Sequence, residues 1–363
     1  MKSNKVVCIN GESWVRNLTG IERLAIEATC FLDRMVPKGT VRLVVPKNAK
    51  NLPSLKNIEI VTLNAEAHFM PAWTQIHFQK YVLSHNGISL NFSNTCPFLC
   101  PGFEFIHDIY CALYPEDLKT RRDKLIYFYS TMMYKRIARK AKAIFTVSEY
   151  TKKTIVEKYG TPADKIHVVY SGVSGYKNIV ADNTIFDKLP VLKDMDFYFT
   201  LGSLSVRKNL KWIVRHAELY PNELFAVSGK PLPTAVSPEL KKLNSLPNII
   251  MTGYLSDGEV KALLKKAKAF VLPTYFEGFG LPPLEALSAG CTIIVSNKTS
   301  LPEIYGKCAH YIDPDEPNVN LDVLLKEDVE SPEKILEKYT LENTAKRMLE
   351  VMKRFDVFGN LQK

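Results

Sequence analysis

Two glutamates in the C-terminal half, Glu277 and Glu285, form an E-x7-E pattern around which the chemistry of this chain is concentrated. A buried-strand pattern at 269–272 runs into a loop with two glycines, and Pro282 and Pro283 then favour the first turn of a helix. Backbone N–H groups at such a loop and helix start lack partners within the helix, so they bind anions, above all phosphate. Carboxylates beside them accept hydrogen bonds from sugar or ribose hydroxyls. The segment therefore predicts a nucleotide-sugar site, although an ordinary helix with glutamates in its first turn gives the same pattern.

A second strand-to-helix corner lies at 201–210, where Gly202 permits a tight turn. Arg207 and Lys208 follow this turn, at the strand end where a ligand belongs. Fixed cations there can hold a diphosphate and stabilise it as it becomes a leaving group. Two solvated charges before a helix would give the same sequence. The presence of both patterns at equivalent corners of one half favours a shared site.

The elements that must position these corners follow from apolar runs and helical spacing. Strand patterns alternate with helical patterns in both halves, which indicates an α/β protein with two doubly wound units whose ligands bind at the carboxyl ends of the strands. The alternation is lost between 171 and 195, which we interpret as the linker. Strands are predicted at 5–9, 41–46, 58–63, 102–106, 143–147, 166–169, 197–201, 224–227, 249–252, 269–272 and 292–295. Helices are predicted at 20–35, 210–220, 257–266, 283–289 and 341–355.

Composition excludes several classes of protein. With 363 residues, 46% hydrophobic and 24% charged, the chain is neither disordered nor fibrous. No apolar run approaches the ~18 residues of a membrane span, and the apolar stretch at 6–9 is too short for a signal peptide. The odd, scattered set of 7 cysteines fits a reducing compartment, and Cys96 and Cys100 lack the further ligand that a zinc site requires. We therefore expect a cytoplasmic protein.

The net charge of +10 has a local source at 118–142, where lysines and arginines alternate with aromatic and aliphatic residues. A basic helix of this kind suits the surface of an anionic membrane. A core helix with a basic outer face explains the segment equally well. No recognised nucleic-acid-binding module accompanies it, so we expect no nucleic-acid partner.

The two corners together resemble retaining glycosyltransferases of family 4, the glycosyl transferases group 1, which have the GT-B fold. Four further motifs carry the resemblance through most of the chain: NLTGIER at 17–23, FIHD at 105–108, TVSEYTK at 146–152 and TGYLSD at 252–257. It implies two Rossmann-like domains facing each other across a cleft. The acceptor domain would comprise 1–178 together with a C-terminal helix at 341–363 that crosses back to it, and 190–340 would form the donor domain.

The resemblance also assigns roles. It implies that Arg207 and Lys208 bind the donor diphosphate and that Glu285 binds the ribose. Glu277 would bind the transferred sugar, and His107 would line the sugar and acceptor side, so both are counted with Arg207 and Lys208 as candidate catalytic residues. In retaining transfer the departing phosphate can accept the proton of the acceptor hydroxyl, which leaves His107 as either a base or a hydroxyl ligand. The remaining donor-site residues implied are Gly20, Gly202, Tyr254, Leu255, Phe279, Gly280 and Leu281.

The activity that the resemblance implies is transfer of a hexose-type sugar from a nucleoside-diphosphate sugar to a glycan or lipid-linked glycan in surface polysaccharide biosynthesis. No metal or other cofactor is expected, and the prolines around Asp313 and Asp315 indicate a turn in place of a metal-binding pair. The membrane partner would be reached through 118–142 at the inner face of the plasma membrane.

Two alternatives stay open: a GT-B-like sugar-nucleotide epimerase, and a non-enzymatic basic α/β module that binds RNA or membrane. The epimerase leaves the E-x7-E corner unexplained. A dehydrogenase would require G-x-G-x-x-G after the first strand, and 9–13 does not supply it.

Overall fold

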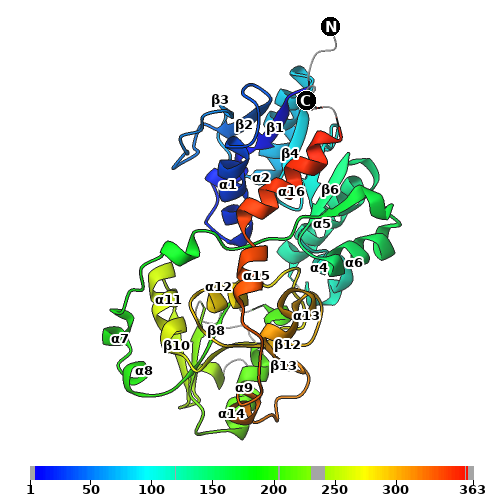
Figure 1. Ribbon diagram of the computed structural model, residues 1–363. Coiled ribbons are helices and arrows are strands. Elements are labelled where there is room, and N and C mark those ends of the chain that lie inside the picture. Colours follow the sequence, from blue (N-terminus) through cyan, green and yellow to red (C-terminus); the bar gives the residue numbers. More distant parts are fainter. Residues whose placement is uncertain (1–4, 119, 203–204, 230–241, 356, 359–363) are drawn as a thin grey trace. The chain divides into compact units, whose positions relative to one another are not determined.

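The computed structural model describes residues 5–118, 120–202, 205–229, 242–355 and 357–358, and Figure 1 shows their path. The chain divides into two compact units. The first unit extends to Gly172 and resumes at Tyr339, and the second unit comprises Val173–Lys338. The chain leaves and re-enters the first unit at adjacent points, because a Cβ atom on Gly172 would lie 2.3 Å from the carbonyl oxygen of Tyr339.

The first unit is built on a seven-stranded parallel sheet in the order β3-β2-β1-β4-β5-β6-β7. Its strands are β1 (Val7–Asn10), β2 (Val41–Pro46), β3 (Glu59–Leu63), β4 (Ile88–Asn91), β5 (Phe103–Phe105), β6 (Ala143–Thr146) and β7 (Ile166–Val168). Most of these strands are buried along their whole length, as expected for parallel strands covered on both faces. The chain order reverses between β1 and β4, so the switch point where such sheets bind ligands lies between these strands.

Helices cover both faces of this sheet. They are α1 (Gly20–Asp33), α2 (Met70–Ala72), α3 (Gln79–Ser84), α4 (Tyr110–Leu113), α5 (Arg121–Lys140), α6 (Glu149–Tyr159) and α16 (Leu341–Lys353), with a π-helical segment at Trp73–Phe78 and 3-10 turns at Gly11–Trp14, Pro115–Asp117 and Ala163–Lys165. The C-terminal helix α16 packs beside α1, as the red and blue helices of Figure 1 show. Arg347 of α16 also donates a hydrogen bond to the carbonyl of Val169 (3.3 Å). The predicted return of the last helix to the first unit is therefore confirmed.

The second unit contains a six-stranded parallel sheet in the order β10-β9-β8-β11-β12-β13. Its strands are β8 (Tyr198–Leu201), β9 (Phe225–Ser228), β10 (Ile249–Gly253), β11 (Ala269–Leu272), β12 (Ile293–Ser296) and β13 (His310–Ile312). Its helices are α7 (Ile185–Lys188), α8 (Val191–Asp194), α9 (Leu210–Leu219), α11 (Asp257–Lys266), α12 (Leu281–Ser288), α13 (Leu301–Tyr305), α14 (Leu321–Leu324) and α15 (Glu333–Lys338), with 3-10 turns at Tyr176–Asn178, Val206–Lys208, Lys242–Asn244 and Gly306–Cys308. The switch point of this sheet lies between β8 and β11, which pair in parallel.

Two features differ from the sequence-based expectation. Strands β4 and β13 were not predicted, because they are short and carry buried polar residues such as Ser89 and Asn91. Much of the segment interpreted as a linker is packed on the second unit. Lys261 of α11 donates to the carbonyl of Tyr176 (3.0 Å), and the buried ammonium lies over the Tyr176 ring.

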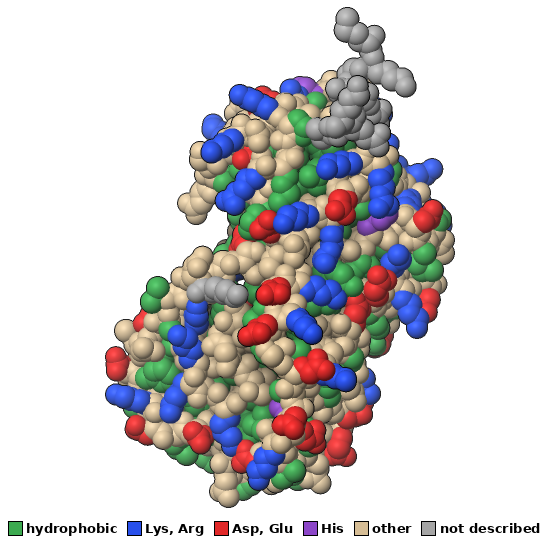
Figure 2. Space-filling view, in the orientation of Figure 1, with side chains coloured by type: hydrophobic (Ala, Val, Ile, Leu, Met, Phe, Trp, Pro, Cys, Tyr) green, Lys and Arg blue, Asp and Glu red, His purple; other side chains and the backbone are tan. Residues whose placement is uncertain are grey.

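The two units differ in charge. The first has 29 Lys and Arg against 17 Asp and Glu, and the second has 19 against 21. On the face drawn in Figure 2, Lys and Arg side chains are spread over the first unit with fewer acidic side chains among them. Within the described part of the chain, no helix has both the length and the apolarity needed to cross a membrane.

Candidate functional site

The two predicted corners of the second unit lie side by side at its switch point. The loop after β8 leads to α9 and the loop after β11 leads to α12. The carbonyl oxygen of Arg207 accepts hydrogen bonds from the backbone N–H of Tyr275 (2.8 Å) and from the hydroxyl of Thr274 (2.6 Å). Backbone atoms of one corner are thus hydrogen-bonded to residues of the other, so the structure brings Arg207, Lys208 and Glu277 into one site.

Lys208 and Glu277 form a buried ion pair at this site. The Lys208 ammonium donates to Glu277 Oε1 at 2.6 Å, and the side chains are 11% and 8% exposed. The stem of Lys208 passes over Gly202, where an added Cβ would lie 3.5 Å from it. Each charge compensates the other in a place with little water. A sugar hydroxyl that reaches the pair can accept from the ammonium and donate to the carboxylate, and a phosphate can be bound by the ammonium.

The glycine loop before α12 is held in place by residues that follow β12. Gly280 adopts φ +87°, and a Cβ there would lie 2.6 Å from Leu301 Cδ2, so the position suits glycine alone. The Tyr305 hydroxyl donates to the Gly280 carbonyl. Two contacts hold the backbone of Glu277: its N–H donates to the hydroxyl of Thr299 (3.1 Å), and its carbonyl accepts from the hydroxyl of Ser300 (3.0 Å). Sequence reasoning missed Thr299, Ser300 and Tyr305, because no motif links them to the loop.

Helix α12 begins at Leu281 without a side-chain cap, and its N–H groups with the helix dipole can receive an anion. Phe279 precedes this start and is buried, and Glu285 lies on the same helix, partly buried. Asn209, at the start of α9, fixes the opposite corner by donating to the carbonyls of Pro273 (2.9 Å) and Pro314 (2.8 Å).

The other predicted residues of the second unit are placed as follows. Tyr254 and Leu255 follow β10 at the same edge of the sheet as the two corners, but β10 is two strands away from β8. The Tyr254 side chain is 86% exposed, whereas Leu255 is buried. Asp313 and Asp315 form a turn, in which the Asp315 N–H donates to Asp313 Oδ1 (2.9 Å). Among the described residues, no three His, Cys, Asp or Glu side chains are grouped so as to ligate a metal ion. The binding roles of the residues named here stay predictions.

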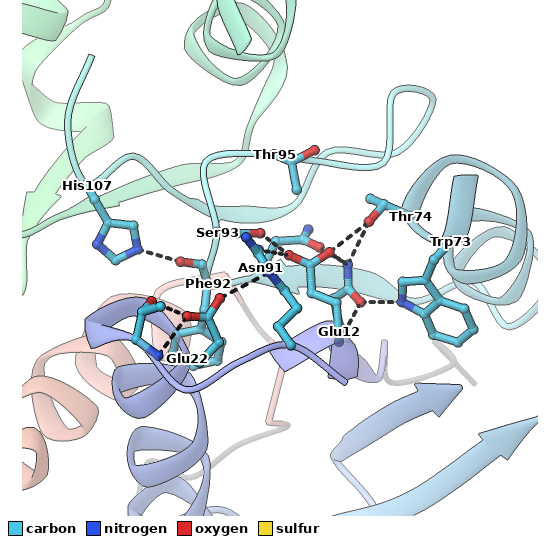
Figure 3. Close-up of polar contacts among 12 residues, drawn as sticks. Glu12, Glu22, Trp73, Thr74, Asn91, Phe92, Ser93, Thr95 and His107 are labelled. Atoms are coloured by element: carbon cyan, nitrogen blue, oxygen red, sulfur yellow. Dashed lines mark hydrogen bonds and ion pairs between the residues drawn. The ribbon is translucent and has the colours of Figure 1, made fainter. Parts of the chain in front are cut away.

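The switch point of the first unit carries a second polar cluster, which Figure 3 shows. Asn10 and Asn91 end the neighbouring strands β1 and β4, and the Asn10 amide donates to Asn91 Oδ1 (2.9 Å). Glu12 is buried beside them and accepts from the hydroxyls of Thr74 (3.1 Å) and Ser93 and from Arg16 (3.4 Å). The Asn91 amide also donates (2.5 Å) to a carboxylate on β5, that of Glu104. Sequence reasoning missed this cluster, because its members come from separate segments of the chain.

Arg16 is held between two buried carboxylates. Its Nη1 lies 3.4 Å from Glu12 Oε1 and its Nε 3.2 Å from Glu22 Oε1, while its own side chain is 41% exposed. Glu22 also forms the capping box of α1 with Thr19, and Gly20 is the exposed first residue of that helix. The formal charges of Arg16, Glu12 and Glu22 sum to −1. The other N–H groups of the guanidinium are therefore better suited to a neutral, hydroxyl-rich ligand than to an anion.

His107 is buried next to this cluster. Its Nε2 contacts the carbonyl oxygen of Phe92 at 2.5 Å, and a carbonyl can only accept, so Nε2 carries the proton and Nδ1 is the acceptor. Burial lowers the pKa of the imidazole, which favours the neutral ring. The Asp108 carboxylate accepts the N–H of Tyr110 (3.0 Å) and shapes the loop that follows. The geometry fits a histidine that accepts a hydrogen bond from a hydroxyl at Nδ1.

Comparisons with known proteins agree with this arrangement. Residues 181–316 match the family described as Glycosyl transferases group 1, and residues 104–174 match Glycosyltransferase Family 4. The chain is 26% identical over 320 residues to the serotype-specific mannosyltransferase WbdA of Escherichia coli, covering 83% of this chain and 38% of the relative. It is 30% identical over 188 residues to O-antigen chain mannosyltransferase B of Escherichia coli, covering 48% and 49%. The chain thus spans less than half the length of these curated relatives.

Among solved structures, sucrose-phosphate synthase from Thermosynechococcus elongatus superposes with a TM-score of 0.70 at 15% identity, covering 97% of this chain and 99% of that one. At this identity the likeness speaks for the fold, and it confirms the predicted α/β architecture of two Rossmann-like units. The two family matches and the fold support one assignment, a glycosyltransferase of group 1 with the GT-B fold.

Proposed function

We propose that the protein transfers a hexose from a nucleoside-diphosphate sugar to an acceptor hydroxyl with retention of anomeric configuration. The observation that carries the proposal is the buried Lys208–Glu277 pair beside the start of α12, at the switch point of the second unit. The ammonium and the helix start suit a diphosphate, and the carboxylate suits sugar hydroxyls. Because the curated relatives are named as mannosyltransferases, a mannosyl donor is the first to test.

In the proposed step, the bond between the anomeric carbon and the diphosphate oxygen breaks as the acceptor oxygen bonds to the same face. Lys208 and Arg207 stabilise the negative charge that develops on the departing diphosphate. The proton of the acceptor hydroxyl passes to the departing phosphate oxygen, so atoms and charges balance without a protein base. Charge neutralisation by these two side chains and by the helix dipole means that the proposed step requires no metal ion.

The acceptor side of the proposal rests on the polar cluster of the first unit. Arg16, fixed by Glu12 and Glu22, donates to acceptor hydroxyls, and His107 accepts from one at Nδ1. We assign His107 the role of hydroxyl ligand in preference to base, because taking up a proton would charge a buried ring whose pKa is already lowered.

The setting of the reaction follows from the names of the relatives. One relative is named O-antigen chain mannosyltransferase B. We propose that this protein extends a glycan carried on a lipid in the same kind of pathway. Such an acceptor would place the protein at the inner face of the plasma membrane as a peripheral protein.

The test is to incubate the purified chain with GDP-mannose, UDP-glucose, UDP-galactose or UDP-N-acetylglucosamine and a synthetic lipid-diphosphate saccharide. We expect one donor to release its nucleoside diphosphate, and the new linkage to show the anomeric configuration of that donor by NMR. In thermal shift experiments with UDP, GDP, dTDP and ADP, the matching diphosphate should stabilise the protein by ~2.7 kcal/mol at 100 times its Kd. An inverted product would disprove retention, and a chain that binds none of the four diphosphates would disprove the proposal.

A further inference from the structure

The turn after β12 holds a threonine in a backbone conformation that threonine rarely adopts. Residues 298–301 form this turn, in which the Leu301 N–H donates to the Lys298 carbonyl (3.4 Å). Thr299 has φ +57°, and Ser300 has φ −81° and ψ −14°, as in a type II′ turn. Glycine is the usual residue at the first of these two positions, because a Cβ atom is unfavourable at positive φ.

The side chain at 299 makes this conformation more costly than it is elsewhere in the chain. Asn51, Asn86 and Asn209 also have positive φ, and asparagine tolerates it. Threonine is β-branched, and a β-branched residue at positive φ is a strained outlier. Strained residues of this kind cluster at functional sites, where the surrounding structure keeps them in place. The side chain of Thr299 is therefore expected to have a role that glycine cannot fill.

Thr299 contacts the site of the second unit. Its hydroxyl accepts the backbone N–H of Glu277 (3.1 Å), and the hydroxyl of the next residue, Ser300, donates to the Glu277 carbonyl (3.0 Å). Two consecutive hydroxyls thus hold the peptide groups on both sides of the Glu277 side chain. A glycine at 299 would relieve the strain, but it would leave the Glu277 N–H without this acceptor.

Two hydrogen-bonding positions stay open in this arrangement. A hydroxyl that accepts one bond still has a proton to donate, and among the described residues no acceptor receives the proton of Thr299. The Lys208 ammonium donates to Glu277 Oε1, whereas Oε2 receives no hydrogen bond within the described part of the chain. The Glu277 side chain is only 8% exposed, so an unpaired oxygen there is costly unless a ligand supplies the donor.

A sugar hydroxyl satisfies both open positions at once. It can accept from the Thr299 hydroxyl and donate to Glu277 Oε2, whereas an ionised phosphate oxygen can only accept. A phosphate at this place would also bring negative charge towards the Glu277 carboxylate, which repels it. Thr299 and Glu277 together therefore suit the transferred sugar better than the diphosphate.

We propose that Thr299 is a further residue that selects the transferred sugar: its hydroxyl donates to one sugar hydroxyl, which in turn donates to Glu277 Oε2. The left-handed backbone brings the Thr299 hydroxyl to this place. The inference rests on the proposed function, because it assigns the sugar to the site where Lys208 and Glu277 meet. It adds a residue that recognises the sugar and takes no part in neutralising the diphosphate.

The test uses the full chain and the nucleotide sugar that it turns over among GDP-mannose, UDP-glucose, UDP-galactose and UDP-N-acetylglucosamine. Each analogue of that donor that lacks one sugar hydroxyl is compared with the parent. Three variants separate the hydroxyl from the strain: Thr299→Ser keeps the hydroxyl, Thr299→Val removes it and keeps the shape, and Thr299→Gly removes both. The matched control is Thr292→Val, at the amino end of β12 and thus at the opposite edge of the sheet.

The expected result concerns the ratio of kcat/KM for the parent donor to kcat/KM for each deoxy analogue. Thr299→Val should narrow this ratio by about 10-fold for one analogue and leave the other ratios unchanged, because a single contact is lost. Thr299→Ser and the control should keep the wild-type ratios. Thr299→Gly should narrow the same ratio as Thr299→Val with a Tm that is no lower, because glycine relieves the strain, and it gives the comparison even where the valine variant does not fold.

A second measurement separates this inference from the proposed function. Thermal stabilisation by the matching nucleoside diphosphate should be the same in every variant, because the contacts to the diphosphate are untouched. Wild-type ratios in a variant that still binds the diphosphate would refute the role of Thr299 alone. A wild-type chain that neither binds a diphosphate nor turns over a donor would refute the proposed function, and this inference with it.

Two further outcomes would overturn the role of Thr299. The first is a loss of kcat/KM in Thr299→Val that is equal for the parent and every deoxy analogue, which indicates support of the loop without contact to the sugar. The second is a Thr299→Ser variant with the same ratios as Thr299→Val, which shows that the hydroxyl is not the group that recognises the sugar.

Discussion

Replacing Lys208 by methionine removes an ammonium group from a buried carboxylate, and we expect the loss to appear in both folding and turnover. The Lys208 Nζ lies 2.6 Å from Glu277 Oε1 and the two side chains are 11% and 8% exposed, so little water can replace the missing partner. Removing one member of such a pair costs about 3–5 kcal/mol of unfolding free energy. Methionine keeps most of the apolar stem that covers Gly202, so the charge is the main change.

The matching variant is Glu277→Gln, and the two combine in a double-mutant cycle. The double variant leaves no uncompensated charge buried, so we expect its unfolding free energy to return to within about 1–2 kcal/mol of the wild type. Turnover should behave differently. Losing the cation at the departing diphosphate lowers kcat by about 10²–10³-fold, and removing the carboxylate as well cannot restore it.

The stability measurement is guanidinium denaturation followed by fluorescence of Trp212, which is buried in the second unit on the helix that follows Lys208. Turnover is followed by release of the nucleoside diphosphate. Near-normal turnover of Lys208→Met would refute the placement of the diphosphate. A double variant as unstable as Lys208→Met would refute the account of the buried pair.

Three further predictions concern other parts of the chain. Burial raises the pKa of the Glu104 carboxyl to about 8, above the ordinary value of 4.5. Between pH 4.5 and pH 8 the unfolded chain releases this proton and the folded chain keeps it, so the unfolding free energy falls as the pH rises. Glu104→Gln should remove this fall, which is up to ~1.4 kcal/mol per pH unit, as measured by urea denaturation across that range. Gly280 and Gly290 have similar backbone angles, φ +87° and φ +83°, but an added Cβ meets Leu301 at Gly280 and open space at Gly290. Gly280→Ala should therefore lower the unfolding free energy by more than Gly290→Ala. Equal losses would show that the clash with Leu301 is relieved at no cost. Arg16→Gln should raise KM for the acceptor by about 10-fold and leave KM for the donor unchanged, and a change in the donor KM alone would contradict the acceptor role.

The meeting of the two corners in the second unit could be predicted from the sequence because the parts of each corner are local. Each half of the site follows a strand within a few residues. The strand pattern at 269–272 is a continuous apolar run, and the pattern at 198–201 is interrupted only by Thr200. Once both are recognised as parallel strands, their carboxyl ends must share one sheet edge. What remained invisible was the support from Thr299, Ser300 and Tyr305, whose contacts depend on where the chain after β12 lies.

The polar cluster of the first unit could not be predicted in the same way. Its members come from separate segments, and β4 carries Ser89 and Asn91, which no apolar pattern identifies as strand residues. Their burial is stable only because Asn10, Asn91 and Glu104 satisfy one another through hydrogen bonds. Such mutual satisfaction depends on three-dimensional neighbours, so residue types and spacing alone do not reveal it.

The contact between Gly172 and Tyr339 has a consequence for how the protein is made. The ribosome completes the second unit before it begins α16, so the second unit can fold while α1 still lacks the helix that packs on it. Until then the nascent first unit exposes the surface that receives Ala345, Met348 and Met352, all of which are buried in the finished protein. The first unit is therefore completed only after the second, although it begins earlier in the sequence.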